Sequence, residues 1–234
     1  MDDIQFEKPL LPPEDNVAYI KDSETAGLSG GVCELAWLKI DMSTLSIMER
    51  HCYRTNPERP IDPGATAIHG ITDDMVADCP TVLEVVSEFD FLTRGVNFIA
   101  HNAAFDKRML AGHVTAHSTL CTLDLSRQYI KGTSKHKLEV LQKELKLPVR
   151  QSHSALGDVL TVHDLLKVIM PLTGVDLQTL FHRASLPQML RTMPFGMHRG
   201  KPFTKVPKSY RSWMREQEGL PKDLSYTLDK YAHI

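Results

Sequence analysis

The sequence predicts an α/β protein, in which a mixed β-sheet is flanked by helices and followed by a small basic C-terminal region. Three apolar, strand-like segments come first, and strand and helix patterns then alternate along the chain. This order is typical of helices packed on the faces of a sheet. Of the 234 residues, 42% are hydrophobic and 24% are charged, which is ordinary for a globular protein and excludes global disorder.

The first part of the sheet is predicted from residues 17–22, 33–40 and 45–53, which are rich in apolar residues. Residues 27–31 contain three glycines, so we expect a turn that reverses the chain and gives a hairpin-like start. Residues 1–16 combine prolines and acids without periodicity. We therefore expect them to form a flexible N-terminal extension without a function of its own.

In the second part of the domain, predicted strands and helices alternate along the chain. A proline-initiated segment with apolar residues at helical spacing predicts a helix, and a short apolar strand then runs directly into another helix. A second passage from strand to helix follows, and then come two helices that we expect to end at Pro148 and Pro171. These predicted segments are residues 80–92, 96–100, 101–106, 118–129, 138–147 and 154–170.

Several classes of protein are disfavoured by composition. No apolar run approaches the roughly 18 residues of a membrane span, and the N-terminus lacks the pattern of a signal peptide. We therefore expect a cytoplasmic protein without a membrane partner. The four cysteines lie far apart without a C-x-x-C pair, so they predict neither a zinc site nor a disulfide framework.

Charge divides the chain into an acidic body and a basic tail. Residues 171–234 contain ten Lys and Arg against five Asp and Glu, although the whole chain has a net charge of −2. Residues 191–215 contain seven basic residues and no acid, with Phe195, Phe203, Tyr210 and Trp213 between them. Such a segment could bind phosphates and stack on bases, or its aromatic residues could form a small core. We expect one domain over 17–172 and a small basic region over 173–234.

A pair of acids ends the first predicted strand. Asp22 and Glu24 are two residues apart, so both side chains would point to the same side of a strand. Two carboxylates held that close raise each other's pKa unless a cation lies between them, and oxygen ligands suit Mg²⁺ or Mn²⁺. An exposed strand end with solvated acids is the alternative, and the triplet alone does not exclude it.

Two further acids and a histidine occupy similar positions. Asp106 lies in the first turn of the helix that leaves strand 96–100, where α/β sheets bind ligands. His153 precedes Asp158 by five residues, a separation of roughly 140° on a helix. The two converge only if His153 lies on the loop or first turn, and Ser152 or Ser154 as N-cap would begin the helix there. With an ordinary pKa of about 6.5, His153 is suited to act as a general base.

Together these residues predict a phosphodiester-cleaving site. Asp22, Glu24, Asp106 and Asp158 could hold two divalent cations about 3.5–4 Å apart, the arrangement that stabilises the attacking and leaving oxygens. His153 would then accept the proton of the attacking water.

Three motifs resemble those of the DEDDh 3′→5′ exonucleases, the superfamily of the polymerase III proofreading subunit. They are Asp22-Ser23-Glu24-Thr25, His101-Asn102-Ala103-Ala104-Phe105-Asp106, and His153 through Asp158. The segment Ile68-His69-Gly70-Ile71-Thr72 is also similar, and residues 194–201 resemble the appended segment of the exodeoxyribonuclease X branch. The resemblance covers roughly residues 17–232 and implies a ribonuclease H-like sheet.

The resemblance also implies roles for individual residues. Asp22, Glu24, Asp106 and Asp158 would bind two Mg²⁺ or Mn²⁺ ions, with His153 as the base. The terminal nucleotide would contact Thr25, Gly27, Leu28, His69, Gly70, Ile71, His101, Asn102 and Phe105, with Leu28 as a wedge between the last two bases. The candidate nucleic-acid contacts of the tail are Arg199, Lys201, Lys205 and Lys208.

The expected activity is hydrolysis of DNA from a single-stranded or frayed 3′ end, which would release nucleoside 5′-monophosphates and serve DNA repair. An exoribonuclease that trims RNA would use the same chemistry, because no residue is seen to recognise the 2′-hydroxyl. A catalytically silent nucleic-acid-binding module is the third alternative. Retention of all five polar residues at the site argues against it.

Overall fold

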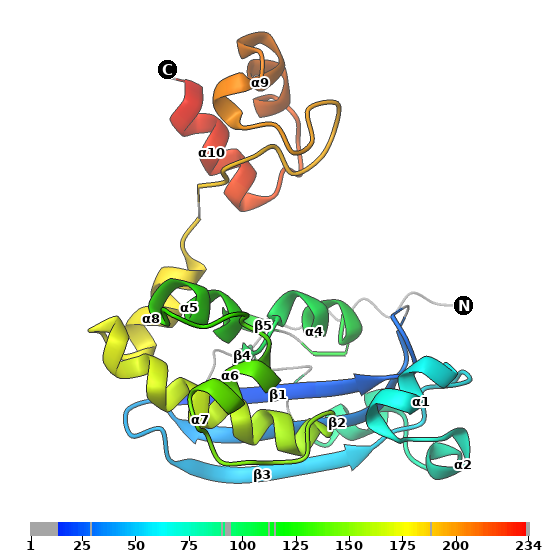
Figure 1. Ribbon diagram of the computed structural model, residues 1–234. Helices are drawn as coiled ribbons and strands as arrows, with labels where there is room; N and C mark the ends of the chain where they lie inside the picture. Colours follow the sequence, from blue (N-terminus) through cyan, green and yellow to red (C-terminus); the bar gives the residue numbers. More distant parts are fainter. Residues whose placement is uncertain are drawn as a thin grey trace. The chain divides into compact units, whose positions relative to one another are not determined.

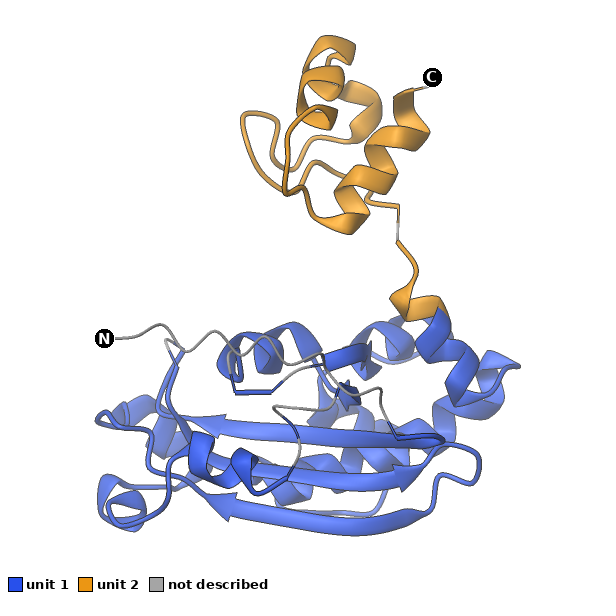
Figure 2. Cartoon of the chain, turned by 180° about the vertical axis from the view of Figure 1, so that it is seen from behind, with its two compact units in different colours: residues 1–182 blue, residues 183–234 orange. Residues whose placement is uncertain are grey.

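The computed structural model (Figure 1) describes residues 14–28, 30–89, 91, 95–111, 113–114, 116–187 and 189–232. The chain divides into two compact units, residues 1–182 and 183–234, which Figure 2 shows in different colours. The predicted N-terminal extension lies almost wholly outside the described residues. No helix in the described part of the chain is long and apolar enough to cross a membrane.

The first unit contains a mixed five-stranded sheet, which confirms the predicted fold class. Its order is β3-β2-β1-β4-β5, in which β1, β2 and β3 pair antiparallel while β4 lies parallel to both β1 and β5. The bounds are β1 Val17–Thr25, β2 Val32–Asp41, β3 Ile47–Arg54, β4 Val96–Ala100 and β5 Ala116–Cys121.

Helices cover both faces of this sheet. They are α1 Pro63–His69, α2 Asp73–Val76, α3 Val82–Ser87, α4 Ala103–Met109, α5 Thr122–Tyr129, α6 Leu138–Glu144, α7 Ala155–Thr173 and α8 Leu177–Ser185. Helix α7 packs on one face together with α5 and α6 (Figure 1). Helix α3 packs on the other face.

Alternation along β1 determines which face each side chain joins. Ala18 and Ile20 are fully buried in the apolar cluster beneath α7, whereas Tyr19 lies in the cluster on the opposite face. Because side chains two residues apart share a face of a strand, Asp22 and Glu24 continue the face that α7 covers. The fold therefore directs these two acids toward α7.

Three predicted helix ends differ from the structure. Helix α7 continues past Pro171 to Thr173 and ends at Gly174, which has the left-handed conformation of a C-cap. Because Pro171 lies in the last turn, its missing N–H removes one intrahelical bond and leaves the rest of the helix intact. Helices α3 and α6 end before the predicted positions, at Ser87 and Glu144.

The second unit has an apolar core of its own. It contains a short 3₁₀ turn, Phe203–Lys205, and the helices α9 Lys208–Arg215 and α10 Lys222–Ala232. The buried apolar side chains of this core are Met193, Phe203, Val206, Met214, Leu224 and Leu228. Among the aromatic residues of the tail, Phe203 is fully buried and Trp213 is 52% exposed. Phe203 is therefore a core residue of this unit, and Trp213 is a surface residue.

Candidate active site

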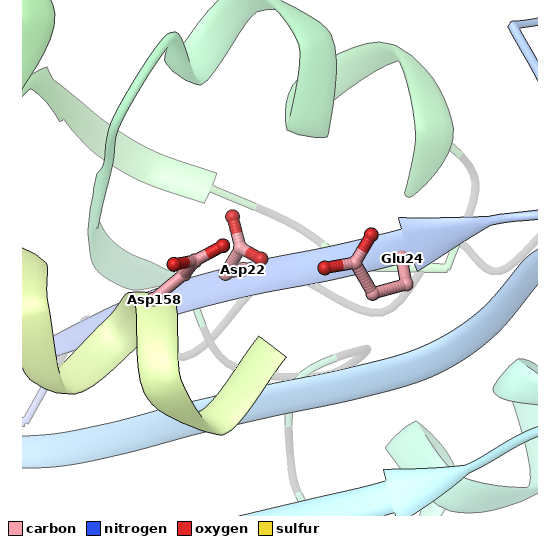
Figure 3. Close-up of side chains that lie close together, drawn as sticks. All are labelled: Asp22, Glu24 and Asp158. Atoms are coloured by element: carbon pink, nitrogen blue, oxygen red, sulfur yellow. The ribbon is translucent and has the colours of Figure 1, made fainter. Parts of the chain in front are cut away.

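Three of the predicted acids come together at the face of β1 that α7 covers. Asp22 and Glu24 lie on β1, and Asp158 lies in the first turn of α7 (Figure 3). One carboxylate oxygen from each residue lies within 4.8 Å of the others, and all three residues are partly buried. The cluster joins residues more than 130 positions apart, which only the packing of α7 on the sheet brings together.

The three acids hold their protons more tightly than ordinary carboxyl groups. Burial, followed by the neighbouring Asp106, Asp158 and Glu24 carboxyls, raises the pKa of Asp22 well above its usual value. The pKa of Glu24 rises to about 7, chiefly through burial and then through Asp158. Burial also raises the pKa of Asp158 to about 6. A cation between these groups would relieve the repulsion.

Asp106 lies beside this cluster but is not among its three close ligands. It is buried on α4, and its Oδ1 accepts a hydrogen bond from the Ser23 hydroxyl at 3.4 Å. Burial raises its pKa to about 6, although the ammonium of the buried Lys21 opposes that effect. Because the charge of Asp106 also acts on Asp22, the two carboxyls share one electrostatic environment. Coordination of an ion by Asp106 stays a prediction.

His153 lies on the loop before α7, as its spacing from Asp158 requires. Its φ of 57° is left-handed, and α7 begins two residues later. The ring is half exposed, with Nε2 at 3.8 Å from a Glu139 carboxylate oxygen. The charge of His153 and its backbone hydrogen bond both lower the pKa of Asp158. The loop thus keeps His153 close to the cluster and accessible to solvent.

Two residues that the sequence analysis missed fix the start of α7. The Glu34 carboxylate of β2 accepts a hydrogen bond from the backbone N–H of Ala155 at 2.8 Å. Gly157 faces the loop so closely that a Cβ atom there would lie 2.2 Å from the Gln151 carbonyl oxygen. An acid within the apolar segment 32–40 was the available signal for Glu34. The role of Gly157 depends on a contact between loop and helix that no local pattern reveals.

The turn after β1 presents an exposed apolar side chain. Leu28 is 83% exposed, and the Thr25 hydroxyl donates to the Gly27 carbonyl at 3.0 Å. Gly27 is packed against Asp62, because a Cβ atom at Gly27 would lie 2.1 Å from the Asp62 carboxylate. Leu28 therefore projects from an anchored turn. Its predicted role as a wedge stays a prediction.

His69 ties the segment after α1 to the end of β1. The Ile71 N–H donates to His69 Nδ1 at 3.1 Å, so the ring carries its proton on Nε2, which donates to the Thr25 carbonyl at 3.2 Å. Gly70 has a left-handed conformation as the C-cap of α1, and the Ile71 side chain is buried. Both ring nitrogens of His69 are thus used within the protein. Substrate contact by His69, Gly70 and Ile71 stays a prediction.

The second motif borders a cavity with a volume of about 710 Å³. His101 donates from Nε2 to the His136 carbonyl at 2.8 Å, and burial lowers its pKa. Asn102 adopts a φ of 67° before α4, a conformation that asparagine tolerates better than most residues. Phe105 is partly buried beneath the Arg108 guanidinium. The cavity lining includes His101, Asn102, Arg127, Lys135, Lys137, Glu139, His153 and Asp158.

The donor set fits a hard divalent cation. All three close ligands are carboxylates, and oxygen ligands are what Mg²⁺ and Mn²⁺ prefer. Burial raises the pKa of each of these carboxyl groups, and repulsion between them adds to the effect at Asp22 and Glu24. The acidic cluster could therefore bind metal.

Comparison with known proteins identifies the class to which this fold and site belong. Residues 20–166 match the model of the exonuclease family, and the chain belongs to that family. The prediction of an exonuclease from this superfamily is confirmed. Residues 183–230 match a separate family model, one named for a quorum-sensing-regulated virulence factor.

The relatives include a protein of similar length. The chain is 32% identical to exodeoxyribonuclease 10 of Escherichia coli strain K12 over 221 residues, which cover 91% of this chain and 97% of the relative. A solved structure of exonuclease X in complex with 5′ overhanging duplex DNA matches with a TM-score of 0.63 and 33% identity. The match covers 72% of this chain and 99% of the solved one. A DNA polymerase III subunit epsilon-like protein of Rhodobacter capsulatus is 33% identical, over 71% of this chain and 26% of the relative.

Proposed function

We propose that the protein is a metal-dependent 3′→5′ exonuclease that hydrolyses DNA and releases nucleoside 5′-monophosphates. The observation that carries this proposal is the convergence of Asp22, Glu24 and Asp158 within 4.8 Å in a chain of the exonuclease family. DNA is favoured over RNA because the relative that spans almost the whole chain is named an exodeoxyribonuclease, and the solved relative holds DNA.

The carboxylates would hold Mg²⁺ or Mn²⁺, with Asp106 completing a site for two ions. Bound divalent ions lower the pKa of a water molecule and stabilise the leaving 3′-oxygen. His153 would accept the proton of the attacking water, because it lies on the loop beside Asp158 and its half-exposed ring can exchange that proton with solvent.

Contacts at the turn after β1 would position the 3′ end of the DNA strand. The exposed Leu28 offers an apolar surface to unstacked bases, and Asn102 lines the cavity that Asp158 also lines. The segment held by His69 lies against the same end of β1. These features support binding of a 3′ end that is single-stranded or frayed, since a paired end would shield its bases from Leu28.

The test is digestion of a 3′-labelled DNA oligonucleotide with Mg²⁺ or Mn²⁺ and with chelator. We expect the Asp22→Asn and Asp158→Asn variants to lose activity, because each keeps the side-chain shape and removes a charge from the cluster. The exposed Asp78→Asn is the matched control and should digest as wild type does. Wild-type rates in Asp22→Asn, or full activity in chelator, would refute the proposal.

A matched RNA oligonucleotide separates the two polynucleotide substrates. Faster digestion of RNA than of DNA would show that the protein is an exoribonuclease instead. Binding without any shortening of either substrate would instead identify a silent binding module.

A further inference from the structure

The C-terminal unit carries a row of aromatic rings at its surface. The ring centroids of His198 and Tyr210 lie 4.5 Å apart, and those of Tyr210 and Trp213 lie 5.4 Å apart. Trp213 is 52% exposed, whereas the apolar core of the unit is built from other residues. We call His198, Tyr210 and Trp213 the aromatic row.

The aromatic row is held in place by the packing of a turn on α9. The Met193 N–H donates to the Lys201 carbonyl at 2.9 Å, and the Gly200 N–H donates to the Met193 carbonyl at 2.8 Å, which closes the turn. At Gly196, where φ is +76°, a Cβ atom would lie 2.5 Å from the Tyr210 hydroxyl. Glycine thus allows the turn to lie directly against α9. The row is therefore formed before any ligand binds.

Positive charge lies beside the row and is not neutralised there. The Lys201 ammonium lies 3.3 Å from His198 Nδ1, and Arg199 is exposed in the same turn. Residues 191–215 contain no acid. Arg211 and Arg215 of α9 are engaged with α10 instead, through the Tyr231 carbonyl at 3.1 Å and the Asp229 carboxylate at 2.5 Å. Arg199 and Lys201 are therefore available to a ligand beside the row.

We propose that the aromatic row, together with Arg199 and Lys201, is a binding site for single-stranded nucleic acid, separate from the candidate active site. Unpaired bases would stack on Trp213 while the two cations contact the phosphates, a combination that binds single strands with little regard to sequence. A duplex buries the faces of its bases and would lack the stacking contribution. A second copy of this chain is a poorer occupant, because pairing two such surfaces would bring like charges together.

The site is tested with the full-length protein in chelator, so that hydrolysis does not enter the measurement and failure of the nuclease proposal stays distinguishable. The probes are a fluorescein-labelled oligothymidylate and a blunt duplex of equal length, followed by anisotropy. We expect Trp213→Ala to raise the Kd for the single strand about fivefold or more and to leave duplex binding unchanged. Trp213→Phe should retain most of the affinity, which controls for folding.

Salt dependence separates stacking from charge. Arg199→Ala and Lys201→Ala should each lower the slope of log K against log salt by about 0.7, the value for one phosphate contact on a single strand. Trp213→Ala should leave that slope unchanged. Intrinsic fluorescence gives a further readout, since Trp37 is buried and the other tryptophan is Trp213. Quenching by the single strand would report stacking on Trp213.

The same unit offers a matched control. On α10, the Lys230 ammonium lies 5.3 Å from the ring centroid of Tyr226. Tyr226→Ala and Lys230→Ala should change the Kd less than twofold. The proposal is overturned if Lys230→Ala weakens binding as much as Lys201→Ala, or if Trp213→Ala leaves single-strand affinity unchanged. It is also overturned if wild type sediments as a dimer that Trp213→Ala dissociates, because the row would then be an interface between copies.

Discussion

Substitution of Gly157 by alanine should reduce catalysis by displacing the loop that carries His153. A Cβ atom at this position would lie 2.2 Å from the Gln151 carbonyl oxygen, whereas ordinary contacts begin at 3.4 Å. The atom that the Cβ would meet belongs to the Gln151 backbone and not to a flexible side chain, so the loop must move by about 1 Å relative to α7. A displacement of that size at a catalytic group can cost about 100-fold in rate, and we expect kcat to fall by about that factor.

The effect on stability should be small by comparison. Overpacking costs typically 1–3 kcal/mol, and replacing glycine by alanine within a helix returns about 1 kcal/mol. We therefore expect Gly157→Ala to remain folded at room temperature with a modestly lower Tm. Its binding of a DNA oligonucleotide in chelator should match that of wild type, because the acidic cluster and the turn after β1 are unchanged.

The assay measures turnover of a 3′-labelled oligonucleotide in Mg²⁺ together with the Tm of each variant. Gly64→Ala is the matched control, since Gly64 lies in α1 and a Cβ atom there meets nothing within 4 Å. If Gly157→Ala and Gly64→Ala turn over equally fast, either the loop is not fixed by its contact with α7 or His153 does not take part in the reaction.

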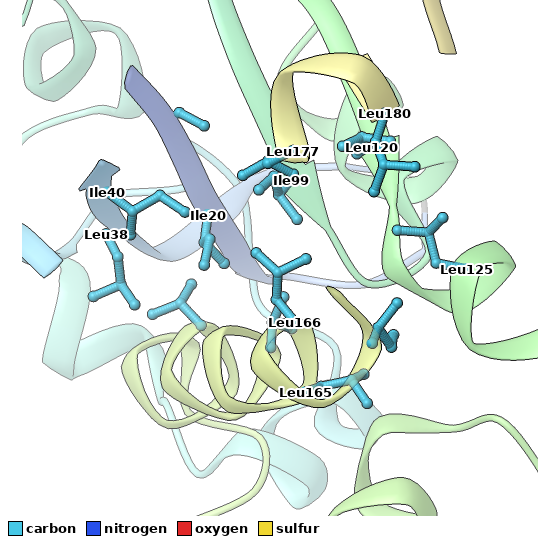
Figure 4. Close-up of a cluster of buried hydrophobic side chains, with 14 of the residues drawn as sticks. Ile20, Leu38, Ile40, Ile99, Leu120, Leu125, Leu165, Leu166, Leu177 and Leu180 are labelled. Carbon is cyan, nitrogen blue, oxygen red and sulfur yellow. The ribbon is translucent and has the colours of Figure 1, made fainter. Parts of the chain in front are cut away.

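Three further predictions concern the electrostatics, the core and the end of β1. The pKa of Glu24 is raised from 4.5 to about 7, so between these pH values the folded state binds more protons than the unfolded state. Metal-free wild type should therefore lose stability relative to Glu24→Gln as the pH rises from 4.5 to 7. Urea unfolding of both proteins at each pH measures this difference. Leu166 is fully buried in the cluster of Figure 4, and Leu166→Ala should lower the free energy of unfolding by about 2–5 kcal/mol. His69→Ala removes bonds to Thr25 and Ile71 and should cost about 2 kcal/mol, and an unchanged urea midpoint would contradict this.

The sheet could be predicted because its strands are strongly apolar. Strand β4 has the predicted bounds, and β1 exceeds its predicted length because pairing with β2 continues as far as Thr25 and Val32. Helix α1 was not predicted, since it has no buried residue and hence no apolar stripe along the sequence. Its proline at the first turn and glycine at the C-cap were the local signals available.

A site residue could be predicted only where a chemically suitable side chain stands at a recognisable place, such as a strand end or a helix start. Asp22, Glu24 and Asp158 follow from their places at a strand end and a helix start, and the structure brings them together. Glu34 is recognisable in the sequence as an acid in an apolar strand, but its partner Ala155 lies 121 positions away, so the local pattern does not reveal its role. In the tail, composition could not separate Phe203 from Trp213, because burial is decided by packing.

Each unit has its own apolar interior, and this independence bears on how the chain melts and on how it could have arisen. The cluster beneath α7 and the cluster around Phe203 share no residue, so calorimetry should resolve two cooperative transitions instead of one. Such a boundary permits recombination of modules. The relative from Rhodobacter capsulatus aligns with 71% of this chain but over only 26% of its own length, so the region that the two proteins share is a minor part of that relative.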